Sequence, residues 1–254
     1  MIRKTVRKWI NQWGYDLIKL NTASLNNGLP IDFSPLDIEI IEKVRPYTMT
    51  SPERIAALIN SVQYLNSNHI KGSIVECGVW KGGSTMAALI TLLKLKDKER
   101  AVYLYDTYEG MSEPTENDES FQGKPASELL ETQDKMISES VWCYSTLEEV
   151  KKNIGSTQYP SEKIHFIQGK VEDTIPAILP EPIALLRLDT DWYESTRHEL
   201  EHLFPLLAKG GVLIIDDYGH WKGARKAVDE YFEKNHIQIL LNRIDYTGRI
   251  AVKL

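Results

Sequence analysis

Short apolar runs alternate with helical patterns from residue 72 to the end of the chain. Runs of β-branched and aliphatic residues predict strands, and apolar residues three or four positions apart predict helices. Two runs, Ile183–Leu186 and Val212–Ile215, contain no polar residue, which is typical of parallel strands covered on both faces. The predicted strands are Ser73–Cys77, Ala101–Asp106, Ile164–Gln168, Ile183–Asp189 and Val212–Asp216, and the predicted helices are Ser84–Leu95, Thr146–Ile154, Tyr193–Leu207 and Ala224–Lys234.

This alternation predicts an α/β fold, because a helix between two parallel strands returns the chain across one face of the sheet. The end of the chain has a different pattern. Two strand-like segments, Ile237–Asp245 and Arg249–Leu254, are separated by Tyr246-Thr247-Gly248, which favours a hairpin. We therefore expect the last strand to run antiparallel to the others.

The first 70 residues lack the alternation and look mainly helical. Thr50-Ser51-Pro52-Glu53 is a typical helix start and predicts a helix over about Pro52–Leu65. Near the N-terminus, apolar residues from Ile2 to Leu20 have helical spacing, with basic residues between them. We expect this amphipathic helix to pack on the domain or on another subunit, as part of a homo-oligomer in which residues 1–45 reach a neighbour, in preference to a membrane surface.

Residues 107–140 form a long connection that is acidic and rich in turn residues around 113–119. Long connections in compact domains are often functional lids. Its position after the second strand of the α/β region favours that interpretation.

Composition excludes several classes of protein. The chain has 254 residues, of which 42% are hydrophobic and 26% charged, so it is neither disordered nor a disulfide miniprotein. Its net charge of -6 disfavours a nucleic-acid binder. No apolar run approaches the roughly 18 residues of a membrane span, and no signal sequence is expected. The two cysteines, Cys77 and Cys143, indicate free thiols in a reducing cytoplasm.

Ligands of open α/β sheets bind at the carboxyl ends of the strands, so the residues that follow each strand are the candidates. The first strand leads into a glycine-rich turn, Gly78 to Gly83, whose glycines would let a ligand approach the backbone. The turn matches neither a dinucleotide nor a triphosphate motif. Glu76, before the turn, suits a ligand with a cationic amino group. Asp106 suits ribose hydroxyls or a helix cap, and the turn at Gly169 and Lys170 suits an adenine ring.

Two pairs of aspartates follow the fourth and fifth strands: Asp189 with Asp191, and Asp216 with Asp217. Four carboxylates at one sheet edge are costly unless a cation neutralises them or some hold protons. An all-oxygen donor set favours Mg²⁺, with Mn²⁺ or Ca²⁺ as alternatives. In the structural alternative, Asp191 and Asp217 cap the helices that follow.

Three segments of the chain resemble motifs of the macrocin/mycinamicin-type sugar O-methyltransferases. Val75–Gly83 resembles their E-x-G-V-W-x-G-G motif, Leu188–Thr196 their D-x-D-x-Y segment, and Gly210–Tyr218 their G-G-x-x-I-I-D-D-Y strand. The resemblance covers about residues 45–250. It implies a class I methyltransferase (Rossmann-like) sheet of seven mostly parallel strands, S-adenosylmethionine as methyl donor, a divalent metal, and a sugar hydroxyl as acceptor. The departures at 1–45 and 110–145 are where acceptor specificity is expected.

On this basis we predict a helical N-terminal extension over residues 1–50 and a methyltransferase domain over residues 51–254. The activity expected is metal-dependent O-methylation of a sugar or glycosylated natural product. A methyltransferase of a catechol-like phenol and a non-catalytic cofactor-binding homologue are the rival interpretations. The residues expected to bind S-adenosylmethionine are Thr48, Met49, Glu76, Gly78, Val79, Trp80, Gly82, Gly83, Ser84, Asp106, Gly169 and Lys170.

Metal binding is assigned to Asp189, Asp216 and Asp217, which end the two strands and whose carboxylates are expected to meet at one ion. Asp191, two residues farther on, is expected to act as general base for the acceptor hydroxyl. The exchanged assignment, with Asp191 on the metal and Asp189 in support, stays open.

Overall fold

A computed structural model describes residues 25–26, 29–137 and 140–254, which divide into two compact units, Met1–Ile38 and Glu39–Leu254. In the first unit, β1 (Leu25–Asn26) pairs antiparallel with β2 (Leu29–Pro30), in a region that the sequence pattern predicted to be mainly helical. Helix α2 (Pro35–Val44) begins in the first unit and ends in the second. The amphipathic helix predicted near the N-terminus, with its expected role in an oligomer, lies outside the described residues.

The second unit contains one sheet of seven strands in the order β5-β4-β3-β6-β7-β9-β8. The five strands β3 to β7 are parallel, and β9 runs antiparallel to both β7 and β8. This confirms the predicted seven-stranded, mostly parallel sheet with an antiparallel last strand. The strands are β3 (Ser73–Cys77), β4 (Val102–Asp106), β5 (Ile164–Gln168), β6 (Ile183–Leu188), β7 (Leu207–Ile215), β8 (Asn242–Arg243) and β9 (Arg249–Val252).

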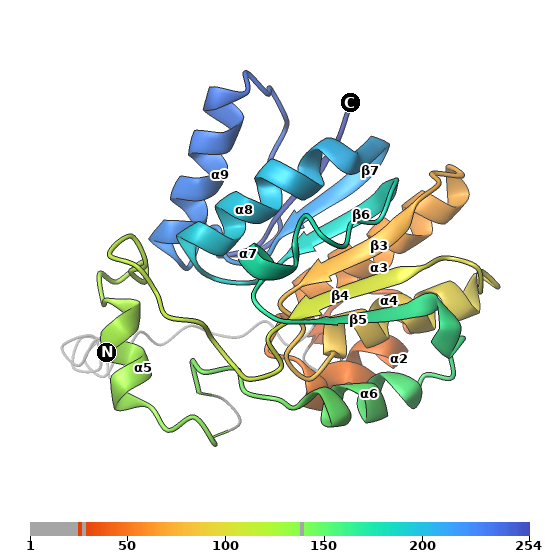
Figure 1. Cartoon of the computed structure of the whole chain (residues 1–254). Helices are drawn as coiled ribbons and strands as arrows, with labels where there is room; N and C mark the ends of the chain where they lie inside the picture. Colours follow the sequence, from red (N-terminus) through yellow and green to blue (C-terminus); the bar gives the residue numbers. More distant parts are fainter. Residues whose placement is uncertain (1–24, 27–28, 138–139) are drawn as a thin grey trace, which may run out of the picture. The chain divides into compact units, whose positions relative to one another are not determined.

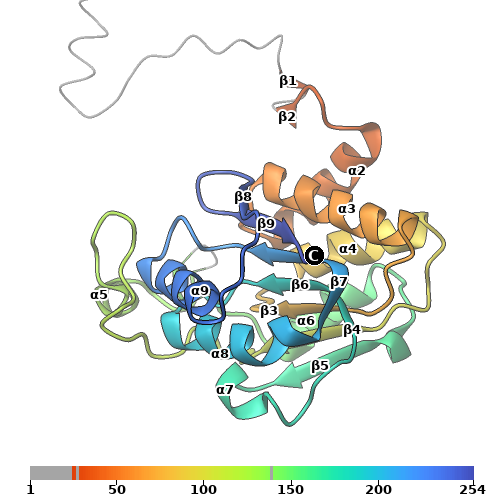
Figure 2. The same cartoon turned by 90° about the horizontal axis from the view of Figure 1, so that it is seen from above.

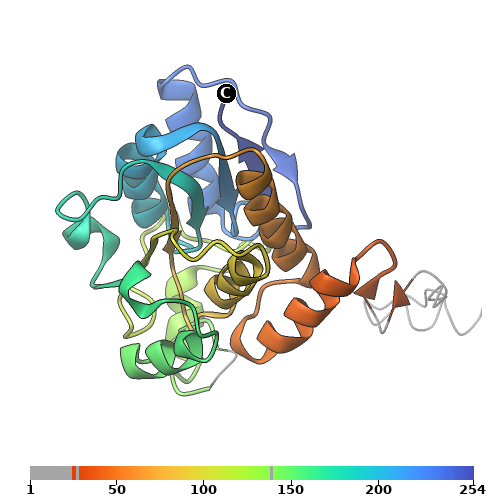
Figure 3. The ribbon, with the colours of Figure 1, turned by 90° about the vertical axis from the view of Figure 1, so that its right-hand side faces the viewer.

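Helices cover both faces of this sheet (Figure 2). Helices α3 (Pro52–Ser67) and α4 (Gly83–Lys94) lie side by side on one face (Figure 3), and α8 (Tyr193–Leu203) and α9 (Lys222–Lys234) pack together on the other. Helix α3 begins as the sequence predicted, since the Ser51 hydroxyl accepts a hydrogen bond from the Arg54 amide and Pro52 starts the helix. The remaining helices are α5 (Ala126–Thr132), α6 (Leu147–Gly155) and α7 (Val171–Thr174).

Two predicted boundaries are wrong. The strand-like segment predicted over Ile237–Asp245 forms a strand only at β8 (Asn242–Arg243). The other departure lies between α8 and β7. Helix α8 ends at Leu203, and a 3-10 turn over Phe204–Leu206 leads into a strand that begins at Leu207, five residues earlier than predicted. Pro205 explains the difference, because it has no amide hydrogen to continue an α-helix. The residues that hid the start of β7 are Lys209, Gly210 and Gly211, of which only Lys209 is exposed.

The centre of the sheet is strand β6, in which every residue is buried. Its apolar side chains, with those of β3 and β7, pack against α8 and α9. One of its residues, Arg187, is charged and only 3% exposed. A buried cation in a central strand requires anionic partners, so the sheet predicts that carboxylates surround it.

The long connection after β4 contains α5 and lies beyond the carboxyl ends of the parallel strands (Figure 1). Its residues Met111, Leu129 and Val141 line the cavity described below, although a lid motion stays a prediction. Within the described ranges, the structure has no helix long and apolar enough to cross a membrane.

We expect Lys253→Met to destabilise the fold. The Lys253 ammonium donates to the carbonyls of Phe204, Pro205 and Leu207 at 2.9, 3.0 and 2.7 Å, at the turn where β7 begins. Removing this shared donor takes one hydrogen bond from each of these carbonyls, at a total cost of about 1–3 kcal/mol. Urea unfolding should show a lower midpoint for Lys253→Met. The matched control Lys209→Met, at an exposed position of β7, should leave the midpoint unchanged; equal midpoints in both variants would contradict the assignment.

Candidate active site

A cavity of about 470 Å³ opens at the carboxyl ends of the parallel strands. Strand-end residues form one part of its wall, and the connection that carries α5 forms another. Of the residues predicted to bind the methyl donor or the metal, those that line this cavity are Thr48, Met49, Gly78, Val79, Trp80, Gly83, Ser84, Asp106, Gly169, Lys170, Asp189, Asp191, Asp216 and Asp217. Glu76 and Gly82 do not.

The glycines of the first turn allow close contacts between segments of the chain. We had expected them to allow a ligand to approach the backbone. Gly78 has a φ of +83°, and a Cβ at this position would collide with the backbone carbonyl of Asp189. A Cβ at Gly83 would meet the Tyr47 carbonyl. Gly82, also left-handed, faces Ile154 of α6. Gly78 therefore lets the end of β3 lie against Asp189, which follows β6. Gly78 and Gly83 also line the cavity.

Asp106 orients the same turn from the end of β4. Its carboxylate accepts hydrogen bonds from the amides of Val79, Trp80 and Tyr108 at 2.6, 3.0 and 2.7 Å. Burial raises the pKa of Asp106, and these amides oppose the rise. A carboxylate has about four acceptor positions. The predicted hydrogen bonds from ribose hydroxyls would therefore use the acceptor positions of Asp106 that these three amides leave free.

Glu76 departs from its predicted place. Its carboxylate is buried away from the cavity, accepts a hydrogen bond from the Thr85 hydroxyl, and pairs with Arg187 at 2.7 Å. Burial raises its pKa to about 7, although the charge of Arg187 acts in the opposite direction. In this structure Arg187 takes the position of the cationic ligand group that we expected beside Glu76.

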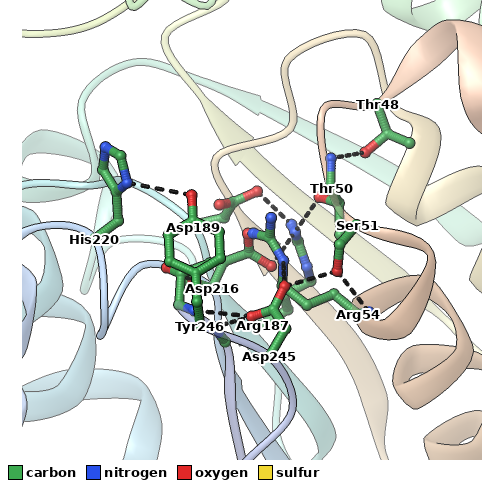
Figure 4. Close-up of polar contacts among 12 residues, drawn as sticks. Thr48, Thr50, Ser51, Arg54, Arg187, Asp189, Asp216, His220, Asp245 and Tyr246 are labelled. Carbon is green, nitrogen blue, oxygen red and sulfur yellow. Dashed lines mark hydrogen bonds and ion pairs between the residues drawn. The ribbon is translucent and has the colours of Figure 1, made fainter. Parts of the chain in front are cut away.

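Arg187 is the centre of an ion-pair network, shown in Figure 4. Its guanidinium donates to Asp189 and Asp216, each at 2.6 Å. Arg54, from α3, also pairs with Asp216, and it donates to Asp245 of the β8–β9 turn at 3.0 Å. Two arginines therefore hold the Asp216 carboxylate, which is the physical reason why this residue does not join the other strand-end carboxylates. Both arginines are functional residues that we did not identify from the sequence.

Asp189, Asp191 and Asp217 face one another, and their carboxylate oxygens lie within 4.8 Å. Burial raises the pKa of Asp191 to about 7, with the charge of Asp189 adding to the effect. Burial and the charges of Asp191 and Asp189 raise the pKa of Asp217 well above its usual range. One oxygen of Asp217, Oδ2, is inaccessible to solvent and accepts no hydrogen bond. Three oxygen donors, with one buried oxygen unpaired, fit a divalent cation such as Mg²⁺.

The helix-capping alternative for these aspartates is wrong. The N-cap residues of α8 and α9 are Trp192 and Trp221, so neither aspartate stands at an N-cap position. The amide of Tyr193, in the first turn of α8, instead donates to Asp118 at 2.7 Å. Asp118 lies in the acidic part of the long connection and is only 1% exposed. The sequence pattern missed it because its neighbours indicate a solvated turn.

Comparison with known proteins gives a consistent result. The profile of the macrocin-O-methyltransferase (TylF) family matches residues 43–251. Demethyldecarbamoylnovobiocin O-methyltransferase of Streptomyces niveus is 31% identical over 202 residues, which cover 80% of this chain and 74% of that protein. Mycinamicin III 3''-O-methyltransferase of Micromonospora griseorubida is 29% identical over the same length, 80% of this chain and 76% of that protein.

Solved structures show the same fold. The O-methyltransferase NovP is similar with a TM-score of 0.71 and 28% identity, and the match covers 82% of each chain. The calicheamicin methyltransferase CalS11 is similar with a TM-score of 0.57 and 14% identity, over 94% of this chain and 98% of that one.

We expect Asp217→Asn to stabilise the metal-free protein. The raised pKa values of Asp191 and Asp217 mean that the folded state binds protons more tightly than the unfolded chain. Stability should therefore fall as pH rises from about 4, the ordinary value for aspartate, through the raised values, about 7 for Asp191. Removing one charge should weaken this fall and raise the melting temperature at pH 8 by several degrees, since about 1 kcal/mol corresponds to about 2–4 °C in a domain of this size.

Thermal unfolding in a chelator between pH 5 and 8 measures the effect. Asp173→Asn, at an exposed position of α7, is the matched control and should follow the wild-type protein. A variant at Asp217 that melts at or below the wild-type temperature at pH 8 would refute the expectation.

Proposed function

The chain belongs to the macrocin-O-methyltransferase family, and from that premise we propose that it transfers a methyl group from S-adenosylmethionine to a hydroxyl of a sugar or glycosylated natural product. The observation that carries the proposal is the group of three carboxylates, Asp189, Asp191 and Asp217, in the wall of the strand-end cavity. The names of the relatives support a sugar acceptor. One of them, from Streptomyces olivaceus, is a tetracenomycin-C 4'-O-methyltransferase whose substrate name includes a dimethoxyrhamnosyl group.

The methyl donor would be held by the part of the cavity wall that comes from the first three strand ends. Ser84, Asp106 and Lys170 supply polar groups there, and Thr48 and Met49 complete this part of the wall. When bound, S-adenosylmethionine supplies a methyl group on a positively charged sulfur. The role of the chain is then to place the acceptor oxygen in line with that methyl group and to remove its proton.

Proton removal falls to Asp191. Its carboxylate lies beside those of Asp189 and Asp217 and forms no ion pair with Arg54 or Arg187 in the described structure, which leaves it available to accept a proton. A sugar hydroxyl is a very weak acid, so a carboxylate alone is a poor base for it. Asp189 and Asp217 would hold a divalent cation, which when bound acts as a Lewis acid and lowers the pKa of a neighbouring hydroxyl.

Asp216 has a different role in this proposal from the metal ligand that we expected from the sequence. Its carboxylate pairs with Arg187 and Arg54, and its backbone carbonyl accepts from the Thr247 hydroxyl at 2.7 Å. We assign it to holding the end of β7 in place, so that the next residue, Asp217, faces the cavity.

We further propose that the protein acts in the cytoplasm, where its two free cysteines stay reduced, and that it forms a homo-oligomer through its N-terminal segment. Neither proposal affects the chemistry of the site.

A methyl-transfer screen tests the proposed function. The enzyme is stripped of metal with EDTA and supplied with S-adenosylmethionine labelled in its methyl group. It is then offered glycosides, nucleotide sugars and catechols, with and without Mg²⁺. We expect label in a glycoside or nucleotide sugar only when Mg²⁺ is present. Label in catechols alone would support the phenol methyltransferase, and no label in any acceptor would refute enzymatic sugar methylation.

The division of labour among the aspartates gives a second prediction. Asp191→Asn should lower kcat by about 10²–10⁴-fold, the usual contribution of a general base, with Mg²⁺ binding retained. Asp189→Asn should weaken Mg²⁺ binding, and excess Mg²⁺ should partly restore its activity. Calorimetric titration with Mg²⁺ and initial rates at rising Mg²⁺ measure both. If Asp191→Asn abolishes Mg²⁺ binding and Asp189→Asn does not, the exchanged assignment is correct.

A further inference from the structure

Three aromatic side chains from separate segments meet beside the cavity: Phe121, His220 and Tyr246, called here the aromatic patch. The ring centroids of Phe121 and His220 are 5.5 Å apart, and Tyr246 lies 6.2 Å from each of them. All three pairs are edge to face. Phe121 is 54% exposed and Tyr246 is 58% exposed. Large exposed rings that lie together mark a binding surface more often than chance, because exposing apolar surface to water is unfavourable.

Backbone hydrogen bonds hold the patch together. The Phe121 amide donates to the His220 carbonyl at 2.7 Å, and Ser120 forms a bridge with Trp221. The Gly219 amide donates to the Thr247 carbonyl at 2.9 Å. These bonds join the long connection, the segment after β7 and the β8–β9 turn, so the backbone that carries the three rings is held together.

The patch is continuous with the candidate active site. His220 and Tyr246 line the same cavity as Asp191 and Asp217, whereas Phe121 lies outside its wall and contacts both rings. His220 follows Asp217 by three residues, and its amide donates to the Asp217 carbonyl at 3.0 Å. Burial and the nearby charge of Arg54 lower the pKa of His220. The path outward from the carboxylates thus passes two aromatic rings in the wall and reaches a third outside it.

We infer that the aromatic patch binds the aglycone of the acceptor, a flat or apolar ring system joined to the sugar whose hydroxyl lies at the aspartates. This inference rests on the proposed function. A free sugar at the carboxylates would contact the residues that line the cavity. Phe121 is not one of them. A group attached to that sugar would extend past His220 and Tyr246 and place its face on Phe121. Ring stacking then selects a glycoside over the free sugar.

Equilibrium binding of two glycosides tests the inference. The probes are 4-methylumbelliferyl α-L-rhamnoside, which carries a flat aromatic aglycone, and methyl α-L-rhamnoside, which carries none. Calorimetry on the full chain with S-adenosylmethionine and Mg²⁺ gives the affinity for each. We expect the wild-type enzyme to bind the aryl glycoside more tightly. Phe121→Ala should reduce the ratio of the two affinities by about five- to tenfold, in line with the energy of a single aromatic pair.

Two further variants separate ring stacking from other causes. Phe121→Tyr keeps the ring and should keep the preference. Leu240→Ala removes an apolar side chain that is 82% exposed and absent from the cavity wall, and should leave both affinities unchanged. Far-ultraviolet circular dichroism checks that each variant is folded.

The outcomes distinguish this inference from the proposed function. A loss of aryl-glycoside affinity that is selective for Phe121→Ala supports the inference. Equal affinities of the wild-type enzyme for the two glycosides, or an equal loss of both in Phe121→Ala, would overturn it. If the aryl glycoside binds through Phe121 but no acceptor in the screen is methylated, the proposed function fails and the aromatic patch remains a ligand site.

Discussion

Arg187 brings a positive charge into the middle of the most buried strand of the sheet, and the candidate active site is arranged around that charge. Removing an ion from water is costly unless partners of opposite charge surround it. Glu76 in β3 supplies one of those partners, and Asp189 and Asp216, directly after β6 and β7, supply the others. Since the guanidinium has a fixed planar fork of donors, it also fixes the directions in which these carboxylates point. The packing of Arg187 within the sheet therefore also determines the geometry of the site.

Arg54 extends this network beyond the sheet. It joins α3 to the end of β7 through Asp216 and to the β8–β9 turn through Asp245. Even with both arginines, carboxyl groups outnumber cations, and the excess collects at Asp191 and Asp217, which neither arginine contacts by an ion pair in the described structure. Raised pKa values at these two residues express the same imbalance. A bound cation would relieve it, so affinity for a metal follows from a deficit of positive charge built into the fold.

The sequence predicted the elements and the sheet edge well, because apolar runs and strand-end residues are local signals. It failed to predict the partners of individual side chains, because these depend on strand register and on the directions in which neighbouring side chains point. Asp216 and Asp217 lie in the bend that follows β7, and their carboxylates diverge, Asp216 toward the arginines and Asp217 toward Asp189 and Asp191. Glu76 lies beside Arg187 because β3 and β6 pair in that register, which no local pattern encodes. The signal that was available was Arg187 itself, a charge inside an apolar run.

In the proposed function, the strand-end carboxylates and the aromatic patch belong to different parts of the chain. Strand ends hold Asp106, Asp189 and Asp217, and the sheet fixes them rigidly. The aromatic patch is built largely from segments outside the parallel strands, which a fold of this kind can vary without moving its core. Asp118 links the two regions, since its buried carboxylate ties the long connection to the first turn of α8, directly after Asp191. A change of acceptor can therefore be accommodated in the connection and the β8–β9 turn, as long as this anchor keeps the loop on the carboxylates.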